Sequence, residues 1–118
     1  MNEEKLTRKD CEVLLVEARL AIEKTVKGKL LEKKNIEEYS EALRENGASF
    51  VTLTKEGQLR GCIGALEPYQ PLIEDVREHA IAAATQDYRF PPVKPGELEN
   101  INIEISRLTK PIPLIYND

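Results

Sequence analysis

The sequence predicts an α+β domain in which a mostly antiparallel sheet is flanked by helices. Three patterns predict this class: a stripe of apolar residues at helical spacing near the start, a hairpin pattern in the middle, and strict apolar–polar alternation near the end. Helical patterns precede, interrupt and flank strands that a short turn connects, which favours antiparallel pairing. Because 118 residues are the usual length of one domain, residues 1–118 are expected to form a single domain.

The first helix is predicted over residues 7–26. Thr7 can cap its first turn, and Asp10 stands three residues later in the capping-box position. Apolar residues then recur at three- and four-residue spacing, and this stripe consists of Cys11, Leu14, Leu15, Ala18 and Ile22. Cys11 is therefore expected to be a buried packing residue rather than a reactive thiol.

A second, shorter helix is predicted over residues 35–47, with Asn35 as its cap and Gly47 at its end. A hairpin follows, in which residues 50–53 and 59–63 are the strands and residues 55–57 the turn.

If the second hairpin strand is regular, its side chains alternate between the two faces of the sheet. Leu59, Gly61 and Ile63 then share one face, and Arg60, Cys62 and Gly64 share the other. Arg60 and Cys62 are thus predicted to be neighbours on one face.

The next helix is predicted over residues 71–86, with Pro71 in its first turn. Its alanine-rich part, residues 80–84, allows close approach to a neighbouring strand. His79 lies beside the apolar stripe of this helix, where it is either a histidine at the margin of the core or a catalytic imidazole.

Residues 87–100 are rich in proline and are predicted to be an ordered loop packed against the sheet. Residues 101–106 alternate strictly, with isoleucines on one face and Asn102, Glu104 and Ser106 on the other, so they form the clearest predicted strand. The prolines at 111 and 113 are expected to end central pairing there.

Composition argues against several classes of function. The 17 Lys and Arg against 21 Asp and Glu are spread evenly and make no basic face, so nucleic-acid binding is not predicted. The chain has no apolar run near the roughly 20 residues that span a bilayer, and its start does not resemble a signal peptide. Two distant cysteines and one histidine make no zinc spacing, so we expect no metal site and a cytoplasmic protein with reduced thiols.

Three ordered segments carry a family resemblance: "FVTLTKEGQLRGCIG", "LEPYQPLIEDVREHAIAAATQDYRFPPV" and "ELENINIEISRLTKPIPL". They resemble the AMMECR domain family, whose hallmark is the hexapeptide that stands unchanged at residues 59–64. The resemblance covers residues 47–114. This chain differs from the family at Tyr88, where members commonly have proline. It is also shorter, because family domains usually continue past the last strand. The chain is therefore expected to lack the family's C-terminal part, which would leave a sheet edge open to self-association into a homo-oligomer.

The resemblance implies an α/β module in which the hexapeptide strand lines a cleft, but it specifies no reaction and leaves any cofactor unknown. In prokaryotes, similar domains occur alone or joined to Memo-type and radical-SAM-type domains, which are the protein partners that the resemblance suggests.

The hexapeptide has both a functional and a structural interpretation. As an enzyme site, Cys62 is the candidate nucleophile, Arg60 the cation that favours its thiolate, and Glu104 or His79 the candidate base. As a packing element, the glycines admit the alanine-rich helix, Cys62 is a small filler, and Arg60 pairs with Glu104 across the sheet. The candidate ligand-binding residues are Arg60, Gly61, Gly64, Arg89 and Phe90.

Two functions from different classes follow. The first is a module that binds a small molecule or a peptide, with the hexapeptide strand and residues 87–92 forming its cleft, and with enzymatic activity left open. The second is a non-catalytic regulatory adaptor, which an exposed patch around Tyr88, Phe90 and Tyr116 would favour.

Overall fold

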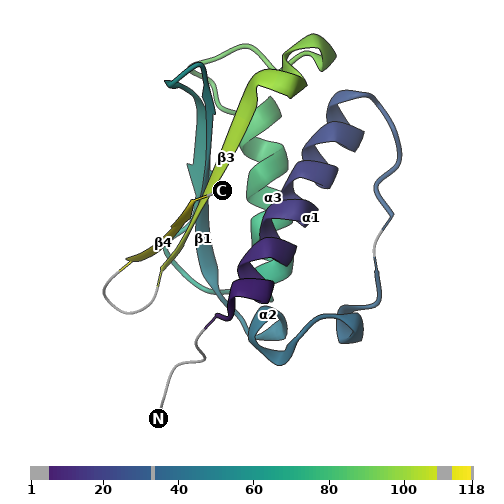
Figure 1. Cartoon of the computed structure of the whole chain (residues 1–118), viewed down its shortest axis with the longest axis vertical. Helices are drawn as coiled ribbons and strands as arrows, with labels where there is room; N and C mark the ends of the chain where they lie inside the picture. Colours follow the sequence, from purple (N-terminus) through teal and green to yellow (C-terminus); the bar gives the residue numbers. More distant parts are fainter. Residues whose placement is uncertain (1–5, 33, 109–112, 118) are drawn as a thin grey trace.

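The computed structural model describes residues 6–32, 34–108 and 113–117, and it has a layer of helices on one layer of sheet (Figure 1). This arrangement confirms the α+β class. In chain order the elements are α1 (Arg8–Val26), the 3₁₀ helix η1 (Ile36–Glu38), α2 (Glu41–Arg44), β1 (Ala48–Lys55), β2 (Gln58–Gly64), α3 (Leu72–Thr85), the 3₁₀ helix η2 (Pro95–Asn100), β3 (Ile101–Leu108) and β4 (Pro113–Asn117).

The sheet has the strand order β2-β1-β3-β4, and all its neighbouring strands are antiparallel. The predicted hairpin is confirmed as β1 and β2, and its tight turn places both Glu56 and Gly57 at positive φ. Beyond the prolines, residues 113–117 pair with β3 as β4, which is an edge strand and not a central one. Pro113 stands at the first position of this edge strand, where a proline removes no hydrogen bond of the sheet interior.

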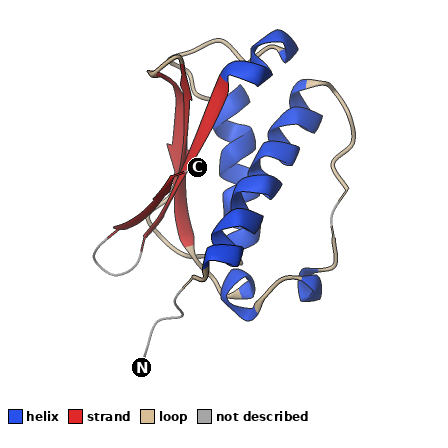
Figure 2. Ribbon diagram, in the orientation of Figure 1, coloured by secondary structure: helices blue, strands red, loops and turns tan. Residues whose placement is uncertain are grey.

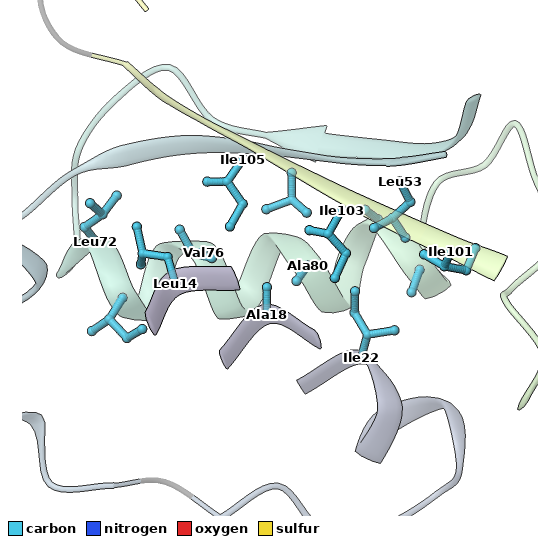
Figure 3. Packing of buried hydrophobic residues seen from close by; sticks show 14 of the residues in the cluster. Leu14, Ala18, Ile22, Leu53, Leu72, Val76, Ala80, Ile101, Ile103 and Ile105 are labelled. Atoms are coloured by element: carbon cyan, nitrogen blue, oxygen red, sulfur yellow. The ribbon is translucent and has the colours of Figure 1, made fainter. Parts of the chain in front are cut away.

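The helices of the described residues all lie on one side of the sheet, as Figure 2 shows. The core sits between the two layers, and Figure 3 shows the inward side chains of α1, α3, β1 and β3 packed together. Val51 and Leu53 of β1 are completely buried there. Their neighbours on β3, Ile103 and Ile105, are at most 2% exposed. No helix of the described residues covers the opposite face of the sheet, toward which the alternate residues of the strands point.

The first helix begins as predicted. The Thr7 hydroxyl accepts the Asp10 N–H, and the Asp10 carboxylate accepts the Thr7 N–H, each at 3.0 Å. Asp10 also accepts the Ser40 hydroxyl at 2.7 Å, which ties α1 to the start of α2. Cys11, expected to be a buried packing residue, is only half-buried.

Two other elements differ from the sequence-based expectation. The helix predicted over residues 35–47 is divided into η1 and α2, because Tyr39 turns into the core and Ser40 has extended backbone at ψ 161°. The loop predicted over residues 87–100 ends in η2. Pro95 lies in the first turn of η2, and the Glu97 carboxylate accepts the Lys94 N–H at 2.9 Å, which stabilises this short helix.

Candidate functional site

Close packing explains why glycine stands at both Gly61 and Gly64 of the hexapeptide. Gly61 faces α3, and a Cβ at this position would overlap the carbonyl oxygen of Ala83. Gly64 faces the other way, and a Cβ there would overlap the Phe50 ring and lie 2.5 Å from the Ser49 carbonyl oxygen. The contact of Gly61 with the alanine-rich helix agrees with the packing interpretation of the motif.

Cys62 lies on the face of the sheet that carries no helix. It is half-buried, and its Sγ is 3.2 Å from Oγ1 of Thr52, the residue directly opposite on β1. Thr52 is in turn opposite Glu104 on β3, whose side chain is exposed. The three side chains therefore form one row across β2, β1 and β3.

Asp87, directly after α3, holds Cys62 from the sheet edge. Because β2 is an edge strand, the outward Cys62 N–H has no strand partner, and it donates to Asp87 Oδ2 at 2.9 Å. The same carboxylate accepts the Arg89 N–H at 3.1 Å and the Arg89 guanidinium at 3.0 and 2.7 Å. The Arg89 guanidinium and the Cys62 N–H hold the pKa of Asp87 well below its usual range. The hexapeptide strand and residues 87–90 are thus joined by one carboxylate.

Phe90 completes this turn. Its N–H donates to the Asp87 carbonyl at 3.0 Å, and the Arg89 guanidinium lies 5.4 Å from the centre of its ring. Arg89 is therefore engaged on both sides while about 45% of its side chain stays exposed.

The carboxylate partner of Arg60 is Glu97 of η2, so the predicted pair with Glu104 is wrong. Arg60 donates through Nε and Nη2 to the two Glu97 oxygens at 2.9 and 3.1 Å, and Lys55 Nζ lies 3.2 Å from Glu97. The Arg60 guanidinium foremost, then the Lys94 N–H and the Lys55 ammonium, lower the pKa of Glu97 to about 2.

The reason for this different partner is a β-bulge. Leu53 pairs with Gly61 and Thr54 with Leu59, which leaves Arg60 as the extra residue. The bulge breaks the regular alternation that predicted Arg60 and Cys62 as neighbours on one face.

His79 lies on the helix side of the sheet, away from Cys62. Its side chain is 7% exposed, and its Nδ1 is 3.1 Å from Oδ2 of the completely buried Asp75, although the N–H is not aligned well enough for a regular hydrogen bond. Asp75 also accepts the Ser49 hydroxyl at 2.7 Å and the Gln70 amide at 3.0 Å. The structure therefore does not bring together the histidine and the thiol that the sequence offered as one site.

Three carboxylates of these clusters were not identified from the sequence. Asp87 and Glu97 lie in a segment predicted only as a loop. Arg89 is two residues from Asp87, but nothing local indicates that Asp87 also binds Cys62 or that Glu97 binds Arg60. Asp75 and His79 do carry a signal, since residues four apart on a helix are neighbours. Within the described residues, no three His, Cys, Asp or Glu side chains stand close enough to hold a metal ion.

Comparison with known proteins identifies the family of this chain. A model of the AMMECR1 family matches residues 15–117. The chain belongs to the AMMECR1 family. It is 47% identical over 112 residues to a protein of Methanothermobacter thermautotrophicus, a match that covers 92% of this chain and 56% of that protein. It is 48% identical over 96 residues to a protein of Methanocaldococcus jannaschii, covering 80% of this chain and 46% of that protein.

A solved structure supports the fold as well. The crystal structure of an uncharacterized protein from Pyrococcus horikoshii is 39% identical, with a TM-score of 0.81, and the match covers 90% of this chain and 54% of that one. The chain thus spans about half the length of the AMMECR1 relatives it matches. In the described part of this AMMECR1 chain, none of the helices is both long and apolar enough to cross a membrane.

Proposed function

We propose that this AMMECR1 chain is a binding module for a small molecule or a peptide, and that its contact surface is the helix-free face of the sheet around Cys62. One observation carries the proposal: the half-buried thiol is presented on that face, and the backbone that carries it is fixed from the sheet edge by the hydrogen bond from the Cys62 N–H to Asp87. With its backbone held by Asp87 and its thiol in contact with the Thr52 hydroxyl, Cys62 is positioned before a ligand arrives.

The surroundings of Cys62 favour contact with a ligand over covalent catalysis. Nucleophilic cysteines are commonly activated by a neighbouring imidazole or cation. The one histidine of the sequence lies on the other side of the sheet against Asp75. The two nearby arginines are both bound to carboxylates, Arg60 to Glu97 and Arg89 to Asp87. The partner that the described contacts give to the Cys62 thiol is the neutral Thr52 hydroxyl.

The row of side chains suggests the chemistry of the ligand. Two strand spacings, about 10 Å, separate Cys62 from the exposed Glu104 carboxylate. Near Cys62, Arg89 is partly exposed and has more N–H donors than its bonds to Asp87 use. A short peptide or a zwitterionic small molecule, with an acceptor toward Arg89 and a donor toward Glu104, fits this row.

Disulfide capture of fragments tests the proposal. In a Cys11→Ser variant, Cys62 is exposed to a library of disulfide-bearing fragments under partial reduction, and captured adducts are identified by mass spectrometry. The matched control carries Val16→Cys, an exposed position on α1, in a chain with both native cysteines replaced. We expect Cys62 to select a defined subset of fragments that the control does not, and Glu104→Gln to change that subset. Equal selection by Cys62 and the control would refute the proposal.

A regulatory adaptor is the second candidate, and the exposure of Tyr88 favours it. The Tyr88 side chain is 95% exposed beside the Asp87–Arg89 turn, and Leu66 is 77% exposed. The partners that follow from the family resemblance are Memo-type or radical-SAM-type proteins in a cytoplasmic setting, or a second copy of this chain. Sedimentation of the wild type and a Tyr88→Ser variant over a concentration series tests self-association: a concentration-dependent dimer that Tyr88→Ser abolishes would support it, and a monomer throughout would exclude it.

A further inference from the structure

A cavity of about 480 Å³ lies over the outward side of α3, on the side of the sheet away from the Cys62 thiol. Its volume is within the range of roughly 300–1,000 Å³ that is usual for small-molecule sites. The hexapeptide contributes Ile63 to it, while the remaining lining comes from α3 and the segments beside it: Leu31, Gln70, Glu74, Arg77, Glu78, His79, Ile81, Ala82 and Gln86.

One wall of this cavity is a buried and oriented imidazole. His79 is more than nine-tenths buried, and its Nδ1 is fully enclosed against the Asp75 carboxylate. The ring edge that reaches the cavity is therefore the one that carries Nε2. Asp75 is itself fixed by the Ser49 hydroxyl and the Gln70 amide, so the ring has little freedom to turn.

The rim beside His79 is acidic. Glu78 accepts the Tyr69 hydroxyl at 2.9 Å and the Gln70 amide at 3.2 Å, which fixes its carboxylate next to the cavity. Gln70 donates to both Asp75 and Glu78, so the inner and outer carboxylates belong to one network. Two bonds leave the Glu78 carboxylate with further acceptor capacity.

The remaining charges of the lining do not cancel this acidity. Glu74 adds a second carboxylate one helical turn before Glu78. Arg77 is 3% exposed, and its guanidinium is directed to the Glu32 carbonyl at 3.3 Å. The lining therefore carries two carboxylates against one cation that is already engaged.

We propose that this cavity binds a small organic cation, namely a primary alkylammonium with a short apolar stem. The ammonium group would bind the Glu74 and Glu78 carboxylates and Nε2 of His79, as a neutral imidazole accepts a hydrogen bond there. The stem would pack on Ile63 and Ile81. The site lies on the other side of the sheet from the ligand surface proposed around Cys62, so neither proposal depends on the other.

The one histidine of the sequence gives a direct readout. We would record the Cε1–H resonance of His79 by NMR at constant pH and ionic strength while titrating n-butylammonium, with butyrate and 1-butanol as matched probes. We expect a saturable shift with n-butylammonium, and no saturable shift with butyrate. A butyrate response equal to that of n-butylammonium, or no saturable shift with n-butylammonium, would overturn the proposal.

Charge variants localise the binding. Glu78→Gln should weaken the binding of n-butylammonium by about tenfold, because the substitution removes a charge-assisted hydrogen bond. Glu38→Gln is the matched control, since Glu38 is exposed on η1 and lines none of the described cavities, and it should leave the affinity unchanged. Equal affinities for the two variants, each shown by circular dichroism to be folded, would overturn the site. If Glu78→Gln does not fold, Glu74→Gln takes its place under the same criterion.

Discussion

Substituting Gly61 by alanine places one carbon into the interface between β2 and α3. The added Cβ would overlap the Ala83 carbonyl oxygen and lie 3.1 Å from the Ala83 carbonyl carbon. Both are backbone atoms in the last turn of α3, so neither can swing aside as the end of a flexible side chain could. Either the helix or the edge strand must move.

We expect Gly61→Ala to lower the free energy of unfolding by about 3 kcal/mol, at the upper end of what overpacking usually costs. Small domains have only about 5–15 kcal/mol in total, so this is a large share. With a urea slope of about 1.5 kcal/mol/M, the unfolding midpoint would fall by about 2 M. Gly61→Val should be more damaging still, because its branched side chain is larger.

Gly96→Ala is the control, because an added Cβ there has nothing within 4 Å. Its φ is not positive, so alanine brings no backbone strain, and the variant should be neutral or up to about 1 kcal/mol more stable. Urea unfolding followed by circular dichroism measures all the variants. If Gly61→Ala is within about 0.5 kcal/mol of the wild type, the range expected for an uninvolved surface position, the close packing of β2 on α3 is refuted.

Three further predictions concern the charged and thiol groups. Arg60→Ala should lower the free energy of unfolding by about 1–2 kcal/mol, because Glu97 keeps Lys55 as a partner. Urea unfolding measures this loss, and a loss equal to that of Gly61→Ala would show that Arg60 is mainly structural. Arg60, the Lys94 N–H and Lys55 together lower the pKa of Glu97 from its ordinary 4.5 to about 2, so the stabilising effect of the Glu97 carboxylate is complete above pH 4.5 and is lost as the pH falls toward 2. The stability difference between wild type and Glu97→Gln should therefore narrow over that range, and a constant difference would contradict it. In single-thiol variants, iodoacetamide should label Cys62 faster than Cys11, because burial raises the pKa of the Cys11 thiol; faster labelling of Cys11 would contradict this.

Local periodicity was enough to predict the long elements of the fold. The capping box at Thr7, the turn at residues 55–57 and the alternation over residues 101–106 each place a boundary or a face from a few neighbouring residues. The close approach of Gly61 to the alanine-rich helix also followed from the sequence, because glycine and alanine leave the room that such contact needs.

The candidate site depends on contacts that the local pattern does not encode. A bulge at Arg60 changes the face of one residue without changing the composition of the strand, so the partner of Arg60 could not be predicted. Asp87 binds Cys62 across 25 residues, and Glu97 binds Arg60 across 37. Such pairs are determined by how the segment after α3 returns along the edge of the sheet, which is a property of the tertiary fold.

The central claim is that the sheet separates Cys62 from His79, so that the thiol meets its ligand without help from the imidazole. The most direct measurement is the pH dependence of Cys62 alkylation in the Cys11→Ser variant, with and without His79→Asn. The geometry predicts the same profile in both proteins. If His79→Asn shifts the pH profile of alkylation while the protein stays natively folded, the imidazole activates the thiol and the claim is contradicted.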